Sequence, residues 1–422
     1  RATYSYQGKY MLTATGRYDG SSKFGTNYKY GFFPSVGAAW RISQEGFAAD
    51  SKTISNLKLR LSAGQTGNQE IGNYITQTYI STTNVLLANG YNAGLFPGST
   101  GNDNLKWETT TQYDIGVDLG LLKNRINVTF DVYQKLTDDM LFNLPVPQST
   151  TTGNAWVNYG SVKNTGFEFT LNTVNVQKTN FSWETQFTIS ANKNEITELG
   201  PTGADIYVAT GAGNGTSVYR VGEPIGSFFG LNRMGTWGTN EAVQAARYGR
   251  VPGDLKFEDT NNDGKIELLT DGKVIGHAYP KFYGGLNNTF TYKNFDASID
   301  IMFVGGVQKA IVHESAEDRQ FVNGMMNTVM DGWRPNHQET MIAQVRAGNA
   351  GARYDSHPDT HMIWNAAYMR GQTASLGYTF HGNLGGIDKL RVYATAENFF
   401  LLTAVKLPGY DTEGSSIQQI NG

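Results

Sequence analysis

The stretch Phe295-Asp296-Ala297-Ser298-Ile299-Asp300-Ile301-Met302-Phe303 decides the fold class of this chain. Its odd positions are all apolar, and Asp296, Ser298 and Asp300 fall between them. Successive side chains of a β-strand point to opposite faces, so a period of two predicts a strand with one apolar and one polar face. One such strand fits many folds, and its repetition along the chain narrows the choice.

The same alternation recurs from one end of the chain to the other. Leu57, Leu59 and Leu61, for example, are interleaved with Lys58 and Arg60. Repeated in segments of roughly ten residues with long polar connections, the pattern is typical of a transmembrane antiparallel β-barrel. We expect about thirteen or fourteen strands. Those assigned by residue are 1–6, 9–18, 33–42, 57–64, 113–119, 126–133, 167–174, 181–192, 282–292, 295–304, 368–380 and 390–399.

In a barrel of this kind the polar face of each strand lines a wet interior. The assignment of these side chains to the interior depends on the alternation, because a shift of one residue in register would move them to the outer face. The polar residues expected there are Asp114, Asp118, Asp131, Glu168, Glu184, Asp296, Asp300, Arg391 and Glu397.

The connections between the expected strands differ sharply in length. Leu122-Lys123-Asn124 and residues 177–180 are short turns, whereas residues 65–104, 200–271 and 309–361 are long polar excursions. Outer-membrane barrels have short periplasmic turns and long extracellular loops, so we expect the long excursions to be extracellular. Within them, residues 240–248 and 312–333 are predicted as short surface helices, the second with Ser315 as a possible cap. A soluble β-sandwich is the alternative for any two strands taken alone.

Composition excludes several other classes of protein. The hydrophobic content is 39%, the mean hydropathy is −0.39, and no run of eighteen apolar residues could span a bilayer as a helix. A net charge of −3 and a pI near 6.1 give no basic surface for nucleic acid. The chain has no cysteine, which excludes disulfides, cysteine-ligated zinc and a thiol nucleophile. Its 23 tyrosines, 22 phenylalanines and 7 tryptophans suit aromatic girdles at membrane interfaces.

No residue pattern supports catalysis. The chain has no Gly-x-Ser-x-Gly elbow, no Walker loop and no His-Glu-x-x-His motif. His357 and His361 are four residues apart, but Pro358 disfavours the helix that would bring them together. Asp138 and Asp139 are adjacent and would point apart on a strand. We therefore predict that the protein is not an enzyme.

Residues 259–271 resemble a calcium-binding loop of the EF-hand type. Side-chain oxygens at positions one, three and five are followed by Gly264, which permits the sharp turn. The closing carboxylate comes one residue late, since position twelve is Thr270. The alternative is an Asn/Asp/Gly turn with no ion, because these residues favour such turns in any case. The candidate ligands of Ca²⁺ or another hard cation are Asp259, Asn261, Asp263, Lys265 through its carbonyl, Glu267 and Asp271.

Aromatic residues of the long loops are candidates for binding a ligand. They lie among Asn, Gly and Thr, a mixture that can stack on sugars and hydrogen-bond to hydroxyl groups. The alternative for any single ring is that it anchors one loop against another. The candidates are Tyr91, Phe96, Trp237, Tyr248, Trp333 and Trp364.

A series of motifs, in the same order along the chain, resembles the SusC/RagA family of TonB-dependent outer-membrane transporters. It includes Tyr219-Arg220-Val221-Gly222-Glu223-Pro224-Ile225-Gly226-Ser227-Phe228-Phe229-Gly230 and Pro280-Lys281-Phe282-Tyr283-Gly284-Gly285-Leu286. Upstream, Arg17-Tyr18-Asp19-Gly20-Ser21-Ser22-Lys23-Phe24-Gly25 and Leu105-Lys106-Trp107-Glu108-Thr109-Thr110 are similar as well. The similarity spans nearly the whole chain, which makes it more specific than any single motif.

The resemblance implies a plugged barrel of the 22-strand class in the outer membrane of Bacteroidetes-type bacteria. It implies import of oligosaccharides or peptides with energy relayed by TonB, beneath a SusD-like surface lipoprotein. Contact with membrane lipid or lipopolysaccharide and a dimer of transporter–lipoprotein pairs are also implied. Residues 1–422 would then be the barrel portion of a longer polypeptide, without the plug and the final strand. The rival hypothesis is a non-transporting surface adhesin or glycan-binding β-module.

Overall fold

The structure is a computed structural model of the chain. It describes residues 1–87, 90–98, 101–145, 154–209, 216–311, 330–346, 358–382, 388–405, 407 and 413. No helix in this part of the chain is long and apolar enough to cross a membrane.

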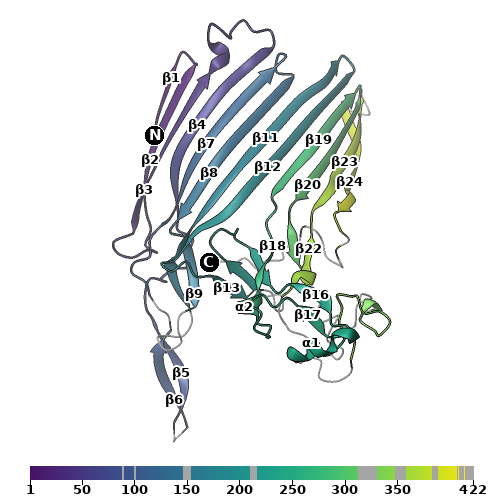
Figure 1. Cartoon of the computed structure of the whole chain (residues 1–422). Coiled ribbons are helices and arrows are strands. Elements are labelled where there is room, and N and C mark those ends of the chain that lie inside the picture. Colours follow the sequence, from purple (N-terminus) through teal and green to yellow (C-terminus); the bar gives the residue numbers. More distant parts are fainter. Residues whose placement is uncertain are drawn as a thin grey trace.

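A sheet of twelve strands forms the wall of the molecule (Figure 1). Every neighbouring pair is antiparallel, and each strand pairs with the next wall strand along the chain. In sheet order the strands are β1 (Ala2–Tyr6), β2 (Tyr10–Gly20), β3 (Tyr30–Arg41), β4 (Ile54–Asn68), β7 (Glu108–Leu121), β8 (Ile126–Asp138), β11 (Gly160–Lys178), β12 (Phe181–Leu199), β19 (Phe282–Tyr292), β20 (Phe295–Gly305), β23 (Tyr368–His381) and β24 (Lys389–Thr403).

All twelve strands that the alternation assigned by residue lie in this sheet, which confirms the all-β prediction. The count of thirteen or fourteen was too high for the wall within the described ranges. The further strands are short ones in the connections, where they form separate small sheets. Several wall strands are also longer than predicted, because their polar ends continue the ladder beyond the apolar pattern. β11 and β12, for example, pair from Gly160↔Leu199 to Lys178↔Phe181.

The wall exposes its apolar residues on one face. Ile115, Val132 and Leu376 are all solvent-exposed in the isolated chain, although they lie in the middle of their strands. Such a row of exposed apolar side chains suits contact with lipid rather than water. Buried hydrophobic clusters lie instead toward one end of the wall and in the long connections. One joins Phe24, Phe33, Ile71, Leu105 and Trp107, and another joins Leu231, Leu255, Phe257 and Ala343.

Short connections lie together at one end of the wall and long ones at the other (Figure 1). The short end contains residues 122–125, 179–180 and 293–294. Gln7 and Gly8, between β1 and β2, both have positive φ, as a type I′ hairpin turn requires. The long end contains residues 69–107, 139–159, 200–281 and 306–367.

The long connections contain their own secondary structure. The elements are β5 (Ile80–Leu87), β6 (Gly90–Pro97), β9 (Leu141–Pro145), β10 (Asn154–Asn158), β13 (Ile206–Ala209), β14 (Thr216–Tyr219), β15 (Ser227–Gly230), β16 (Arg233–Thr236), η2 (Thr239–Glu241), α1 (Ala242–Arg247), β17 (Leu255–Phe257), α2 (Leu268–Asp271), β18 (Lys273–His277), β21 (Gln308–Ala310), η5 (Thr360–Met362) and β22 (Ile363–Asn365). The helix predicted at 240–248 is confirmed as η2 and α1. The helix predicted at 312–333, with Ser315, lies outside the described residues up to residue 329.

Candidate functional site

The polar face of the wall carries charged side chains that pair across strands. Arg60 donates to Asp118 over 3.1 Å and to Asp131 over 3.0 Å. Lys58 Nζ lies 3.7 Å from Asp118. Between β4 and β8, the β7 residue opposite both Arg60 and Asp131 is Gly116. A Cβ there would stand 2.1 Å from Asp131 Oδ1, so the ion pair passes over this strand only because the residue is glycine.

A second ion pair of the same construction lies on the same polar face, near the opposite edge of the sheet. Arg391 on β24 donates from Nε to Asp296 on β20 over 3.0 Å. The intervening strand supplies Gly377, whose Cβ would lie 2.8 Å from both the guanidinium and the carboxylate. The strand register places the nine charged residues expected in the interior on this one face.

A polar hollow of about 190 Å³ lies between these two ion pairs, toward the short-turn end. Glu184 is the one charged side chain of its lining. Apart from Val174, which pairs with Glu184, the other polar-face residues that line it carry amides or a hydroxyl, and they are Asn127, Asn172, Gln186, Asn287 and Thr289. This face therefore offers neutral hydrogen-bond donors and acceptors between two charged zones.

The two longest connections interlock into one body, which we call the loop assembly (residues 200–281 and 306–367 where described). β13, β14, β15 and β18 form a four-stranded sheet in the first connection, and β16 pairs with β17. Arg233 of β16 and Asp359 of the second connection form a buried ion pair, 7% and 0% exposed. Arg233 Nε donates to Asp359 over 2.8 Å, and Nη1 donates to the Met341 carbonyl over 2.9 Å. Asp359 also accepts from the His361 amide at the start of η5.

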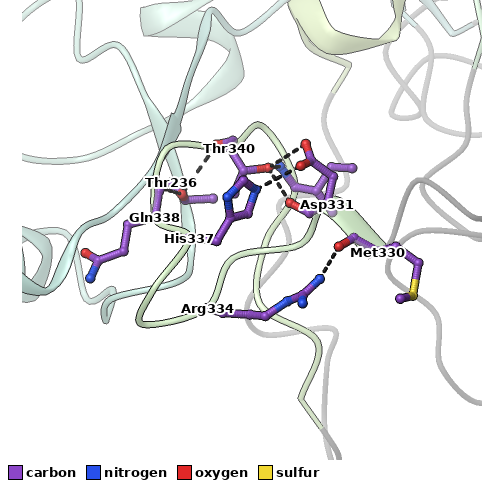
Figure 2. A network of polar contacts seen from close by, with 8 residues as sticks. Thr236, Met330, Asp331, Arg334, His337, Gln338 and Thr340 are labelled. Atoms are coloured by element: carbon purple, nitrogen blue, oxygen red, sulfur yellow. Dashed lines mark hydrogen bonds and ion pairs between the residues drawn. The ribbon is translucent and has the colours of Figure 1, made fainter.

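The segment 330–346 lies along β16 and adds polar contacts between the two connections. Figure 2 shows His337 and Thr340 converging on Asp331, with His337 Nε2 2.8 Å from its carboxylate. Thr236 of β16 donates to the Gln338 carbonyl over 2.9 Å. Arg346, at the end of the segment, pairs with Asp254 over 2.9 Å. The segment is therefore held along β16 by both buried charges and hydroxyl groups.

The six aromatic candidates do not form one surface. Trp237 is buried and stacks on Tyr248 with ring centroids 5.7 Å apart, and Lys256 Nζ lies 4.7 Å from the Trp237 ring. Trp333 is buried within the loop assembly, and Trp364 packs on the cluster of Val307, Ile311, Ala366 and Leu407. Tyr91 and Phe96 lie outside the loop assembly, on opposite faces of β6. The six residues therefore do not form a single binding site. Among them, Trp237 and Tyr248 are in contact.

The loop at residues 259–271 closes through hydrogen bonds. Asp259 accepts from the Gly264 amide over 3.0 Å and from the Tyr248 hydroxyl over 3.1 Å. Asp271 is buried and accepts from the amides of Thr260 and Glu267, each over 2.9 Å. Burial by itself would raise the pKa of Asp271, but the hydrogen bonds from Glu267 and Thr260 lower it overall.

Asp271 thus joins the two ends of this loop, the role that a closing ligand would have around an ion. Within the described ranges no group of three or more His, Cys, Asp or Glu is arranged to hold a metal ion. Asp259 Oδ1 is buried and has no hydrogen-bond partner in the same part of the chain. Calcium binding by this loop stays a prediction.

The connection predicted as an irregular loop at 65–104 contains a hairpin. β5 and β6 pair from Ile80↔Pro97 to Leu87↔Gly90 and project beyond the long end of the wall (Figure 1). One face of the hairpin carries Ile80, Leu86, Tyr91 and Leu95, which are 69% to 78% exposed. Alternation in this stretch is interrupted by Thr82 and Asn84, which explains why sequence reasoning missed the strand. An apolar face on an isolated hairpin is costly in water, so it indicates a contact surface.

An antiparallel wall with an apolar face, a charged polar face and all long connections at one end defines an outer-membrane β-barrel portion. The model of the family described as TonB-dependent receptor-like, β-barrel, matches residues 1–295. TonB-dependent receptor P26 of Formosa agariphila is 35% identical over 425 residues, covering 99% of this chain and 42% of that protein. TonB-dependent receptor SusC of Bacteroides thetaiotaomicron is 32% identical over 443 residues, covering 99% of this chain and 41% of that protein.

A solved structure described as the RagAB peptide transporter superposes with a TM-score of 0.80 at 23% identity. The superposition covers 99% of this chain and 45% of that one. The chain therefore belongs to the TonB-dependent receptor-like β-barrel family and is an outer-membrane protein. It spans less than half the length of each of these two receptors.

Sequence reasoning missed the Arg233–Asp359 pair altogether. The two residues are 126 positions apart, and neither lies in a recognisable motif. The glycines beneath the ion pairs were also missed, although each occupies a polar-face position of an alternating strand. A glycine at such a position, flanked by charged residues on neighbouring strands, is the signal that could have located them.

Proposed function

We propose that this chain forms the wall and outer loops of a transporter that imports oligosaccharides or peptides across the outer membrane. In this proposal the polar face lines the lumen and the apolar face meets lipid or lipopolysaccharide. TonB supplies the energy, and the loop assembly and the β5–β6 hairpin lie outside the cell. The observation that carries the proposal is the polar face, which combines two charged zones with an amide- and hydroxyl-lined hollow. Sugars and peptide backbones are recognised by such neutral hydrogen-bonding groups.

A SusD-like surface lipoprotein is the proposed partner, and two such pairs would form the dimer. The β5–β6 hairpin supports this part of the proposal. Its apolar face is uncovered in the single chain and lies beyond the end of the wall, where a surface lipoprotein could reach it. A relative named SusC and a structure described as the RagAB peptide transporter support the same class of assembly.

Co-purification and uptake test the proposal together. The tagged protein is extracted from its own outer membrane, and bound lipoprotein and growth on oligosaccharide or peptide are measured. We expect L86S/Y91S/L95S to reduce lipoprotein recovery by about tenfold or more, since exposed apolar anchors dominate such interfaces. The matched control T83S/V85S/N92S changes the opposite hairpin face and should bind like the wild type.

Loss of TonB should abolish growth on the imported nutrient. If no lipoprotein co-purifies and TonB has no effect on uptake of any oligosaccharide or peptide, the transporter proposal is wrong. Tight binding of glycan without uptake would favour the adhesin or glycan-binding module instead.

A further inference from the structure

The short-turn end of the wall is strongly cationic. We define the short-turn rim as the described residues of six connections between successive wall strands: 6–10, 41–54, 121–126, 178–181, 292–295, and 381–382 with 388–389. Each of these six segments contains a lysine or arginine, although the chain as a whole has a net charge of −3. The cations are Lys9, Arg41, Lys52, Lys123, Arg125, Lys178, Lys293 and Lys389, against the acidic residues Glu45, Asp50 and Asp388.

Most of this positive charge is available to a ligand. Lys123, Lys178, Lys293 and Lys389 are exposed and form no ion pair within the described part of the chain. Glu45, by contrast, is engaged by Lys9 over 3.2 Å and by the Tyr10 hydroxyl over 2.7 Å. The four lysines belong to four successive hairpins, β7–β8, β11–β12, β19–β20 and β23–β24. Neighbouring turns are two strand spacings apart, about 10 Å, so each lysine can meet a separate group.

Aromatic rings lie on the apolar face near several turns of the short-turn rim, and they mark the depth of that end of the wall. Tyr10 stacks on both Tyr6 and Trp40 just before the first turns. Trp183 stacks on Phe290 with centroids 5.7 Å apart. Tyr and Trp rings concentrate at the boundary between hydrocarbon and headgroups. Lys293 directly follows Tyr292, and its Nζ lies 5.5 Å from that ring, so this lysine reaches the level of lipid phosphates.

A polar cluster on the apolar face also indicates that this end of the wall lies at the level of the lipid headgroups. Asn288 accepts from the Trp183 indole over 2.9 Å and from Thr185 over 2.7 Å, and Thr185 in turn accepts from Asn175. Hydroxyl and amide groups facing hydrocarbon would be costly, whereas at the headgroup level they are solvated. The turns beyond them are therefore placed among headgroups.

We propose that the short-turn rim binds anionic phospholipid headgroups through Lys123, Lys178, Lys293 and Lys389. The inference rests on the proposed orientation, in which this rim faces the periplasm and the phospholipid leaflet. Clustered lysines at a membrane surface attract anionic lipid, and ammonium groups bind phosphate as point charges. A row of exposed lysines with aromatic rings beside it at the β11–β12 and β19–β20 turns favours lipid over a protein partner, which would need buried apolar anchors at the rim.

Lipid selectivity of the protein extracted from its own outer membrane tests this site. The protein is reconstituted in phosphatidylcholine, and the motionally restricted fraction of spin-labelled phosphatidylglycerol is compared with that of spin-labelled phosphatidylcholine. We expect about a threefold preference for phosphatidylglycerol in the wild type, reduced to nearly none in K123Q/K178Q/K293Q/K389Q and by high salt. The control K23Q/K29Q/K106Q/K193Q removes the same charge near the long end and should keep the preference.

Folding of each variant is verified by its heat-modifiable mobility on gels. If the fourfold variant does not fold, K178Q/K293Q should lose about half of the preference. Retention of the full preference by a folded rim variant, or its absence from the wild type, would overturn the site. A photo-crosslinker at Lys178 that captures protein instead of lipid would also overturn it. Uptake is not measured in this experiment, so its failure is distinct from failure of the transporter proposal.

Discussion

The wall and the loop assembly distribute their hydrophobic residues in opposite ways. In the wall, Ile115 in the middle of β7 is 56% exposed, while the next residue, Gly116 on the polar face, lies beneath the Arg60–Asp131 ion pair. In the loop assembly, Phe229 and Leu231 are fully buried, and even Arg233 is enclosed with its partner. The wall is thus organised for a lipid solvent, whereas the loop assembly has the buried core of a water-soluble domain.

This difference shows which forces hold each region. The wall depends on its backbone ladder and on lipid, because its side chains bury little apolar surface against one another. The loop assembly depends on packing and on polar contacts between distant segments. The two regions should therefore respond to different substitutions, and each of the following experiments separates them.

The largest effect is expected from R233M. Met fills much of the space, but Asp359 is left buried without its partner, which costs about 3–5 kcal/mol. Hydrogen exchange in denaturant should show loss of protection in residues 227–236 and 358–362, with wall peptides unchanged. The double variant R233M/D359L removes both charges and should recover most of the loss. Equal loss of protection in the wall would show that the two regions are not independent.

The reverse experiment is V132K, which places a charge on the apolar face in the middle of β8. A lysine near the bilayer midplane costs about 2–4 kcal/mol. Refolding into lipid vesicles with urea titration should show this loss, with the loop assembly unaffected. T170K, on the polar face of the neighbouring strand β11, is the control and should be close to neutral. A neutral V132K would mean that this face does not contact lipid.

G116A tests the ion pair that passes over β7. The added Cβ would overlap Asp131 and Arg60, and forced repacking of this kind costs about 1–3 kcal/mol. Urea titration in vesicles measures the change. G37A is a matched wall glycine whose Cβ would have its closest neighbour at 3.8 Å, and it should be tolerated. If G116A and G37A lose the same stability, the Arg60–Asp131 ion pair does not depend on the absence of a side chain at position 116.

The smallest effect is the pH response of the loop at 259–271. The pKa of Asp271 in the folded chain lies below its usual value, so its stabilisation is complete above that usual value, about 3.9, and is lost as the pH falls through the folded pKa. Amide exchange of this loop, corrected for its intrinsic pH dependence, should therefore accelerate below about pH 4. D271N should exchange faster at neutral pH and respond less to acid. An unchanged D271N profile would contradict the role assigned to this carboxylate.

Sequence reasoning predicted the wall well because strand alternation is a local property. Each of the twelve strands could be assigned from its own residues, and the polar face followed from the same period. The hairpin at 80–97 escaped because Thr82 and Asn84 interrupt its apolar face. The closed form of the 259–271 loop could not be predicted either, since residue types alone do not decide whether carboxylates accept from amides or bind an ion.

The candidate site was harder to predict because it depends on contacts between distant segments. Trp237 and Tyr248 were identified from their chemistry. That Tyr91, Phe96 and Trp364 lie apart from them could not be predicted, because it depends on how the connections fold. Arg233 and Asp359 carry no motif and meet only through folding of two connections. The order of motifs along the chain had indicated a TonB-dependent transporter, and the match to the TonB-dependent receptor-like β-barrel family agrees with it.

The most direct test of the account is the topology of the chain in intact cells. The chain contains no cysteine, so single cysteines can be placed at Val243 in the loop assembly, Lys123 in the short-turn rim and Val132 on the apolar face. A membrane-impermeant maleimide should label position 243 on whole cells and position 123 only after the outer membrane is permeabilised. Position 132 should react only with a lipid-soluble reagent. Labelling of position 123 from outside, or protection of position 243, would contradict the account.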